Sequence, residues 1–186
     1  MSRADATKAR ILQAATAEFG RYGIAGARVD RIAATAAANK NLIYVYFGSK
    51  DRLFDAVFDE YVAHGLEAVP FTADDLPGYA GALYDYCRTH PDVLRLATWH
   101  RLERGSNPDN TIVNTGSTYD AKTKALRAAQ RSGSVGKTFS VSDLLTLVIA
   151  IATAWGPSNV AAIPRHGRPD AGRRAAVEAV RRLIAQ

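Results

Sequence analysis

The chain has 186 residues and a formal net charge of +6, and 47% of its residues are hydrophobic. This composition excludes an intrinsically disordered protein, and the length suits one sizeable domain or two small ones. The single cysteine, Cys87, excludes an internal disulfide, no apolar run is long enough to span a membrane, and the first residues, MSRADATKAR, lack the apolar stretch of a signal peptide. We therefore expect a cytoplasmic protein with no membrane partner.

The positive charge is concentrated at the start of the chain. Residues 1–52 contain nine Lys or Arg and four acidic residues, whereas the remaining 134 residues contain 15 basic and 14 acidic ones. A basic module on a nearly neutral body is typical of proteins that bind the phosphate backbone of a nucleic acid. An ordinary solvated face is the alternative, so the charge alone does not identify the partner.

The first predicted elements are three helices. The first covers residues 5–22, and Gly20 and Gly23 mark its exit. Two short helices follow over residues 29–36 and 40–46, separated by a tight turn. Each has an apolar face, formed by Val29, Ile32, Ala33 and Ala36 in the first and by Leu42, Ile43 and Phe47 in the second. This pattern predicts a helix-turn-helix that docks onto a larger helical body.

Helices are also predicted over residues 50–66, over 74–90 with a capping start at Thr72 and Asp75, after Pro91, and near 118–132. The stretch RSGSVGKT at 131–138 is a near match to a phosphate-binding loop. It has Arg131 where the first glycine should stand, and it follows a helix instead of a strand. We therefore interpret it as an interhelical loop. Period-two alternation is confined to the short run LIYVYF, so no β-strand is expected.

The last two predicted helices carry wide apolar surfaces. Residues 140–155 are apolar nearly all round, and a final helix places an apolar stripe opposite arginines. Two such helices are typical of half a four-helix interface that a second subunit completes. The predicted dimerisation residues are Leu144, Leu147, Val148, Ile151, Trp155, Val177, Val180 and Ile184. A core within one chain is the alternative.

Residues 11–53 resemble the N-terminal DNA-binding domain of the tetracycline-repressor (TetR) family of bacterial regulators. The matching features are the opening helix ILQAATAEFGRYG, the V-x-x-I-A that starts at Val29, the Y-x-Y-F that ends at Phe47, and Ser49-Lys50 followed by Leu53. The resemblance implies an all-α homodimer without a cofactor. It implies a helix-turn-helix DNA-binding domain over residues 1–50 and a helical ligand-binding and dimerisation domain over residues 51–186. Such a protein binds a palindromic operator in double-stranded DNA, usually as a repressor, and a small molecule releases it.

The resemblance also assigns the DNA contacts. Residues 29–36 become the positioning helix and 40–46 the recognition helix, in which Lys40 and Asn41 read base edges. The other predicted contacts go to the sugar-phosphate backbone, from Arg28, Tyr44, Tyr46 and Lys50. For the two tyrosines, an ordinary half-buried core position is the alternative.

Two positions depart from the family pattern. Arg28 stands near the family's usual threonine, and although it could contact phosphate it cannot cap the positioning helix. Ala37 stands where the family has its turn glycine. If Ala37 is left-handed, alanine costs about 1 kcal/mol relative to glycine; alternatively the turn is shifted and Asn39 takes the unusual conformation.

The middle of the chain is rich in aromatic side chains with polar tips. We predict that they line an apolar pocket for a small apolar or amphipathic effector, and the candidates are Tyr61, Tyr84, Trp99, His100 and Tyr119. Simple core packing is the alternative for each of them.

Enzymatic and metal-binding functions have little support in the sequence. The spacing of Cys87, His90, His100 and Glu103 invites a metal hypothesis, but scattered histidines are more often polar surface or pocket residues. No Gly-x-Ser-x-Gly nucleophile motif is present, so we predict neither a catalytic residue nor a metal site. The competing function is a helical ligand-binding or scaffolding protein that has lost DNA binding. The retained basic charge of residues 1–52 argues against it.

Overall fold

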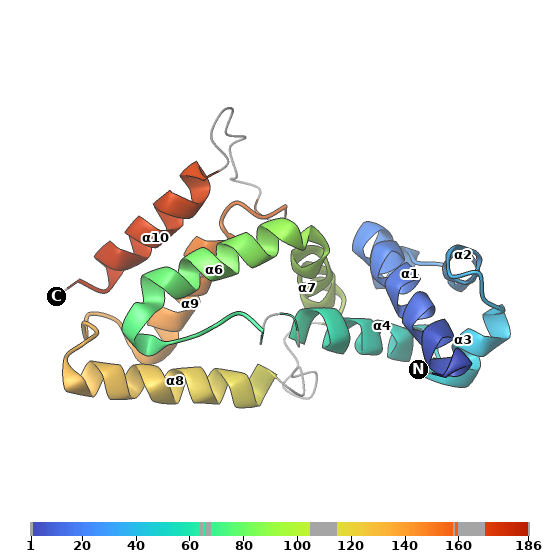
Figure 1. The fold of residues 1–186 in the computed structure, drawn as a ribbon, viewed down its shortest axis with the longest axis horizontal. Coiled ribbons are helices and arrows are strands. Elements are labelled where there is room, and N and C mark those ends of the chain that lie inside the picture. The colour runs from blue at the N-terminus through green and yellow to red at the C-terminus, as the bar shows by residue number, and fades with distance from the viewer. Residues whose placement is uncertain are drawn as a thin grey trace. The chain divides into compact units, whose positions relative to one another are not determined.

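A computed structural model describes residues 2–63, 65, 68–104, 115–157, 159 and 170–185. The described residues form helices joined by turns and contain no strand, which confirms the all-α prediction (Figure 1). The helices are α1 (Arg3–Gly26), α2 (Val29–Thr35), α3 (Lys40–Phe47), α4 (Lys50–Phe58), the π-helix η1 (Asp59–Ala63), the 3₁₀-helix η2 (Ala73–Asp75), α6 (Leu76–Thr89), α7 (Pro91–Arg104), α8 (Thr115–Ser132), α9 (Val141–Thr153) and α10 (Ala171–Leu183). No helix among the described residues is long and apolar enough to cross a bilayer.

The chain divides into two compact units. Unit 1 comprises Met1–Gly65 with Asp92–Val113, and unit 2 comprises Leu66–Pro91 with Asn114–Gln186. Helix α7 therefore packs with α1–α4, although it follows α6 in the chain. The predicted boundary near residue 50, between a DNA-binding domain and a ligand-binding and dimerisation domain, differs from the boundaries of these two units. It remains a prediction.

The core of unit 1 forms where α1 packs against α4. Phe19 of α1 and Phe54 of α4 are fully buried and meet edge to face, with ring centroids 5.2 Å apart. The short helices α2 and α3 add Ile32 and Ile43 to this core, and both are at most 1% exposed. The apolar faces predicted for residues 29–36 and 40–46 are thus directed inward. The opposite faces of both helices are left for solvent or a partner.

Helix α1 continues past Gly20 and breaks at Gly23. The backbone of Gly23 has φ 70° and ψ −176°, a conformation that only glycine adopts readily. A Cβ at this position would lie 2.5 Å from Glu103 Oε1 and 2.8 Å from Trp99 Cε3. Gly23 therefore permits both the bend in α1 and the close approach of α7.

In unit 2, α6 packs against α9 and α10, and α8 packs against α9 (Figure 1). The 3₁₀ turn η2 follows Thr72, and Asp75 then caps α6 by accepting a hydrogen bond from the Gly78 amide. The RSGSVGKT stretch lies between α8 and α9, so its interpretation as an interhelical loop is confirmed. Gln130 Nε2 holds this loop by donating to the carbonyls of Gly136 and Phe139, each at 3.0 Å.

The predicted dimerisation residues fall into two groups. Leu144, Val148 and Val180 are at most 1% exposed because they fill the core of unit 2 within one chain. They cannot form an outer surface, so for these three the intramolecular alternative describes the structure. The half-buried group comprises Leu147, Ile151, Trp155, Val177 and Ile184. Ile149, which was not predicted, lies on α9 and is 37% exposed.

Candidate nucleic-acid interface

The turn between α2 and α3 depends on one left-handed alanine. Ala37 has φ 47° and is the only non-glycine residue with positive φ in the described part of the chain. Asn39 has an ordinary extended backbone and caps α3, since its Oδ1 accepts a hydrogen bond of 2.8 Å from the Asn41 amide. Of the two alternatives for this turn, the structure therefore has Ala37 in the unusual conformation. The start of α3 is consequently at Lys40, as predicted.

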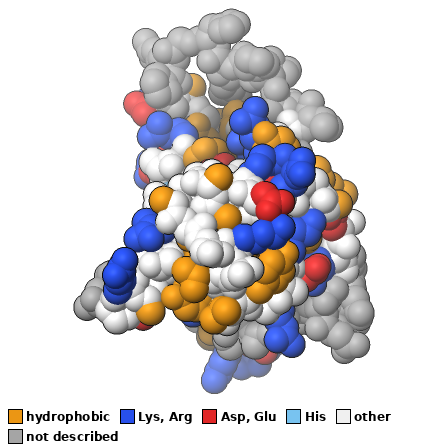
Figure 2. Space-filling view, turned by 90° about the vertical axis from the view of Figure 1, so that its right-hand side faces the viewer, with side chains coloured by type: hydrophobic (Ala, Val, Ile, Leu, Met, Phe, Trp, Pro, Cys, Tyr) orange, Lys and Arg blue, Asp and Glu red, His pale blue; other side chains and the backbone are white. Residues whose placement is uncertain are grey.

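Helix α3 divides cleanly into a buried and an exposed side. Ile43 and Phe47 are buried, whereas the exposed residues occupy the other side of a helix with 3.6 residues per turn. These exposed residues are Lys40, Asn41, Tyr44 and Val45. Figure 2 views the side of unit 1 that carries α2 and α3, where basic side chains are spread over the surface among apolar, neutral and fewer acidic ones. A face of this kind suits a polyanion.

The Lys40 ammonium forms an ion pair with Asp30 of α2, with Nζ 2.8 Å from Oδ1. The hydrogen bond and charge of Asp30 raise the pKa of Lys40, and the same contacts lower the pKa of Asp30. Lys40 therefore stays cationic, and its position is defined relative to α2. Because both side chains are largely exposed, the ion pair contributes little to stability.

The two predicted backbone-contacting tyrosines differ in exposure. Tyr44 is 43% exposed on the outer side of α3, where its hydroxyl is accessible to a partner. Tyr46 is half-buried and packs edge to face against Phe47, with ring centroids 6.4 Å apart. The backbone-contacting roles of both tyrosines remain predictions. For Tyr46, the contact with Phe47 agrees with the alternative, an ordinary half-buried core position.

Arg28 lies at the N-cap of α2 and makes no side-chain capping bond there. Its side chain is exposed, and its backbone amide donates to Glu18 Oε1 at 2.9 Å. Glu18 is only 9% exposed and also accepts a hydrogen bond of 2.7 Å from Arg31 Nε. Burial alone would raise the pKa of Glu18, but the bonds from Arg31 and from the Arg28 amide hold it below its usual value. A carboxylate from α1 thus binds the N-cap amide of α2, where the positive end of the helix dipole also favours a negative charge.

Sequence reasoning missed Glu18, although a signal was present. Glu18 follows Ile11 and Ala15 at spacings that place all three on one helical stripe. A carboxylate on an apolar stripe is normally paired, because an unpaired buried charge is costly. The tertiary partner, Arg31, lies 13 residues further on and is not identifiable from helical spacing.

Lys50, the last predicted contact, lies at the start of α4, where Ser49 caps the helix through the Arg52 amide. The Lys50 ammonium donates to the carbonyls of Ala25 and Ala27, each at 3.2 Å. These carbonyls terminate α1, so Lys50 holds the end of that helix in the free protein. A phosphate contact from the same ammonium remains a prediction.

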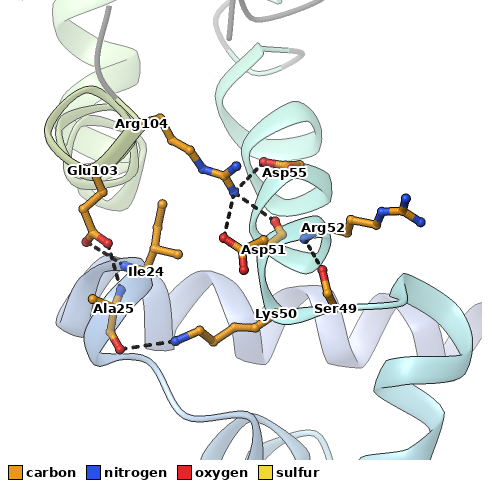
Figure 3. Close-up of polar contacts among 9 residues, drawn as sticks. All are labelled: Ile24, Ala25, Ser49, Lys50, Asp51, Arg52, Asp55, Glu103 and Arg104. Carbon is orange, nitrogen blue, oxygen red and sulfur yellow. Dashed lines mark hydrogen bonds and ion pairs between the residues drawn. The ribbon is translucent and has the colours of Figure 1, made fainter. Parts of the chain in front are cut away.

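Two charged residues attach helix α7 to α1 and α4 within unit 1 (Figure 3). The Glu103 carboxylate accepts hydrogen bonds from the Ile24 and Ala25 amides at 2.9 and 2.8 Å. Arg104 forms ion pairs with Asp51 and Asp55 of α4, at 3.5 and 2.9 Å. Sequence reasoning assigned neither residue to this contact, because the partners are about 50 to 80 residues away along the chain.

The predicted effector-binding residues are distributed over both units. In unit 1, His100 stacks on Phe58 with a centroid distance of 4.3 Å, and Trp99 packs over Gly23. Burial and the nearby Arg104 lower the pKa of His100, which favours the neutral imidazole, although Asp55 acts in the opposite direction. Tyr61 is half-buried in η1.

In unit 2, Tyr84 meets Trp155 edge to face at 5.8 Å and packs over Gly172. Tyr119 is 42% exposed on α8. The effector-binding roles of all five residues remain predictions.

The residues considered for a metal site also belong to different units. Cys87 and His90 belong to unit 2, whereas His100 and Glu103 belong to unit 1. Burial raises the pKa of the Cys87 thiol to about 11, which disfavours the thiolate that a metal requires. Among the residues that the structure describes, no group of three or more His, Cys, Asp or Glu side chains is placed to hold a metal ion.

Two models of known protein families together match most residues of the chain. Residues 11–57 match the model described as "Bacterial regulatory proteins, tetR family", and residues 75–182 match "Tetracyclin repressor-like, C-terminal domain". The first match contains all of α2 and α3, and the second contains α6 and most of α10. Both halves of the chain are therefore covered by models of one group of proteins.

Individual relatives agree with these models. The HTH-type transcriptional repressor SCO4008 of Streptomyces coelicolor is 43% identical over 148 residues, which cover 80% of this chain and 77% of the relative. The HTH-type transcriptional repressor NicS of Pseudomonas putida is 33% identical over 110 residues, covering 55% of this chain and 52% of that protein. Among solved structures, SCO4942 of Streptomyces coelicolor superposes with a TM-score of 0.81 at 37% identity, covering 96% of this chain and 98% of the other.

Proposed function

Because this chain belongs to the TetR family of DNA-binding transcriptional regulators, we propose that it is a repressor that binds an inverted-repeat operator as a homodimer through α3. The observation that carries this proposal is the exposed side of α3. Lys40 and Asn41 are exposed there at the start of the helix, in the part that reads bases in helix-turn-helix proteins. SCO4008 and NicS are both named as repressors, which supports the direction of regulation.

The individual contacts follow from side-chain chemistry. A lysine ammonium donates to the guanine acceptors O6 and N7, and an asparagine amide pairs with adenine N6 and N7. Tyr44 and Arg28 are exposed beside them and are suited to the sugar-phosphate backbone. The proposed contact set is therefore divided into base-reading residues, Lys40 and Asn41, and backbone-contacting residues, Arg28, Tyr44, Tyr46 and Lys50.

The experiment that tests this assignment selects bound duplexes from random DNA with the purified protein and measures affinity for the enriched operator over a range of salt concentrations. Lys40→Ala and Asn41→Ala should change the base preference at defined positions of each half-site. Lys50→Ala should weaken binding to all sequences alike and reduce the salt dependence of affinity, because a phosphate contact carries no sequence information.

The matched control is Lys137→Ala, since Lys137 is an exposed lysine in the loop between α8 and α9. It should leave both affinity and base preference unchanged. An unaltered base preference in both the Lys40 and Asn41 variants would refute α3 as the reading helix. An absence of any enriched sequence would refute sequence-specific binding by this chain.

The proposed homodimer uses the outer surface of α9 and α10. The half-buried residues Leu147 and Ile151, which lie one turn apart on α9, and Val177 on α10 give this surface apolar character that a second copy can cover. Symmetric pairing of two chains places two recognition helices on one face of the duplex, in successive major grooves about 34 to 36 Å apart or somewhat more.

A small apolar or amphipathic effector completes the proposal. The half-buried His100, whose pKa is lowered, offers a neutral imidazole that can bind a neutral polar group of a ligand. An effector releases DNA only if it binds the non-competent form of the dimer more tightly, and a preference of about 1 to 3 kcal/mol is sufficient for a working switch. The test is a screen of diverse apolar compounds for loss of operator binding, repeated with His100→Phe for any compound that acts.

A further inference from the structure

One residue on the exposed side of α3 does not fit a purely polar DNA-reading surface. Val45 is 74% exposed, the largest exposed fraction among the large hydrophobic side chains of the described residues. It lies between Tyr44 and Tyr46, and none of the predicted DNA contacts involves it. Its role is therefore unassigned.

Neither folding nor helix formation explains a valine at this position. An exposed side chain adds little to the core, and valine has a lower helix propensity than alanine or lysine. Single exposed apolar residues are common on protein surfaces, so exposure by itself carries no conclusion. What distinguishes Val45 is that it lies on the same side of α3 as Asn41 and is separated from it by one helical turn.

We infer that Val45 is a specificity-determining residue that packs against the C5-methyl group of a thymine in each operator half-site. This inference rests on the proposed function, in which α3 enters the major groove. The thymine methyl is the one apolar group that base edges present in that groove, and apolar side chains that reach it are its usual partners. The branched side chain of valine is held near one rotamer in a helix, so it offers a rigid surface to the methyl group.

The geometry of the helix also locates the thymine. Four residues of α-helix advance by about 6 Å, and successive base pairs are about 3.4 Å apart. The thymine therefore lies within about two base pairs of the base that Asn41 reads. An apolar contact with this methyl group complements the hydrogen bonds of Lys40 and Asn41, because a methyl group neither donates nor accepts a hydrogen bond.

The test replaces each thymine of the selected operator half-site in turn by deoxyuridine, which removes the C5-methyl group and leaves base pairing unchanged. For the wild-type protein, one thymine position should lose about fourfold in affinity per half-site, the factor that corresponds to about 0.8 kcal/mol for one methylene-sized group. In a symmetric operator that carries both replacements, the two factors multiply to about 15-fold.

Val45→Ala should bind the unmodified operator more weakly and lose the deoxyuridine effect at that one position, while the effects at all other thymines persist. The matched control is Leu102→Ala, since Leu102 is 70% exposed but belongs to α7. It should behave as the wild type at every position. Unchanged thermal unfolding of Val45→Ala confirms that its fold is intact.

The outcomes separate this inference from the function on which it rests. Deoxyuridine effects that are the same in Val45→Ala and in the wild type overturn the role of Val45 and leave DNA binding by α3 standing. A selected operator that has no thymine within two base pairs of the Asn41-dependent position also overturns it. Failure of the wild-type protein to select any sequence overturns both conclusions.

Discussion

Gly23 and Glu103 together form the contact between the bend in α1 and the end of α7. The bend at Gly23 frees the amides of Ile24 and Ala25 from the helical pattern, and the Glu103 carboxylate accepts hydrogen bonds from both. The absence of a side chain at Gly23 leaves the space that Glu103 and Trp99 occupy. The last turn of α1, which leads directly into α2, is thus fixed by a residue of α7 (Figure 3).

We expect Gly23→Ala to destabilise unit 1 by about 2 to 4 kcal/mol, because the left-handed backbone disfavours alanine and its Cβ would clash with Glu103 and Trp99. Urea unfolding followed by tryptophan fluorescence measures the change. Gly26→Ala is the control, since a Cβ there meets only the Tyr22 side chain at 3.4 Å and the backbone φ is not positive. Equal stability of the two variants would contradict the role of Gly23.

Ala37→Gly should stabilise the protein by about 0.5 to 1 kcal/mol, because glycine adopts the left-handed conformation without strain. The same substitution at Ala34, an exposed residue within α2, should have the opposite sign and cost about 1 kcal/mol, because glycine there only weakens the helix. Urea midpoints of the two variants give the comparison. Destabilisation by both substitutions would show that the turn does not strain Ala37.

Glu18→Gln should lower the free energy of unfolding by about 2 kcal/mol at neutral pH, because the Arg28 amide and Arg31 lose a charged acceptor. Since the pKa of Glu18 is lowered on folding, its contribution is fully present above the ordinary pKa near 4.5 and disappears as the pH falls through the folded value. The difference between the wild type and Glu18→Gln should therefore shrink in unfolding curves measured from pH 7 down to pH 3. A difference that is constant over this range would show that the charge of Glu18 is not responsible.

His100 should make the protein sensitive to mild acid. Its pKa is lowered on folding, so the stabilisation is complete above the ordinary value near 6.5 and is lost as the pH falls from there toward the folded value. His100→Phe should retain the ring contact with Phe58 and lose less stability than the wild type between pH 7.5 and 5.5. Leu102→Ala, at an exposed position of the same helix, is the control that should leave this pH dependence unchanged. Identical profiles for the wild type and His100→Phe would argue against protonation of His100 as the cause.

Charges placed on α9 and α10 should separate assembly from folding. Leu147→Glu, on the half-buried side of α9, should give a folded monomer, whereas Val180→Glu should unfold unit 2, because Val180 is buried within one chain. Sedimentation velocity and far-ultraviolet circular dichroism distinguish these results. Leu102→Glu is the control and should stay dimeric. A dimeric Leu147→Glu protein would place the interface elsewhere.

Much of this protein could be inferred from local sequence patterns. Helical spacing of apolar residues predicted α1–α3 and the Lys40 start of the recognition helix, because periodicity and capping act over a few neighbouring residues. The family resemblance over residues 11–53 was sufficient to predict a DNA-binding regulator. The exposed positions of Lys40, Asn41 and Tyr44 follow from the same helical geometry that buries Ile43 and Phe47.

Only the tertiary structure decided which residues meet across the chain. Glu18 pairs with Arg31, Lys50 binds the end of α1, and Glu103 holds the bend at Gly23, and each contact joins different helices. The structure also divided the apolar residues of α9 and α10 into those that fill the core of one chain, such as Val148, and those left at the surface, such as Ile149. The sequence alone could not make this division, because an apolar helical stripe has the same spacing whether its own chain or a partner covers it.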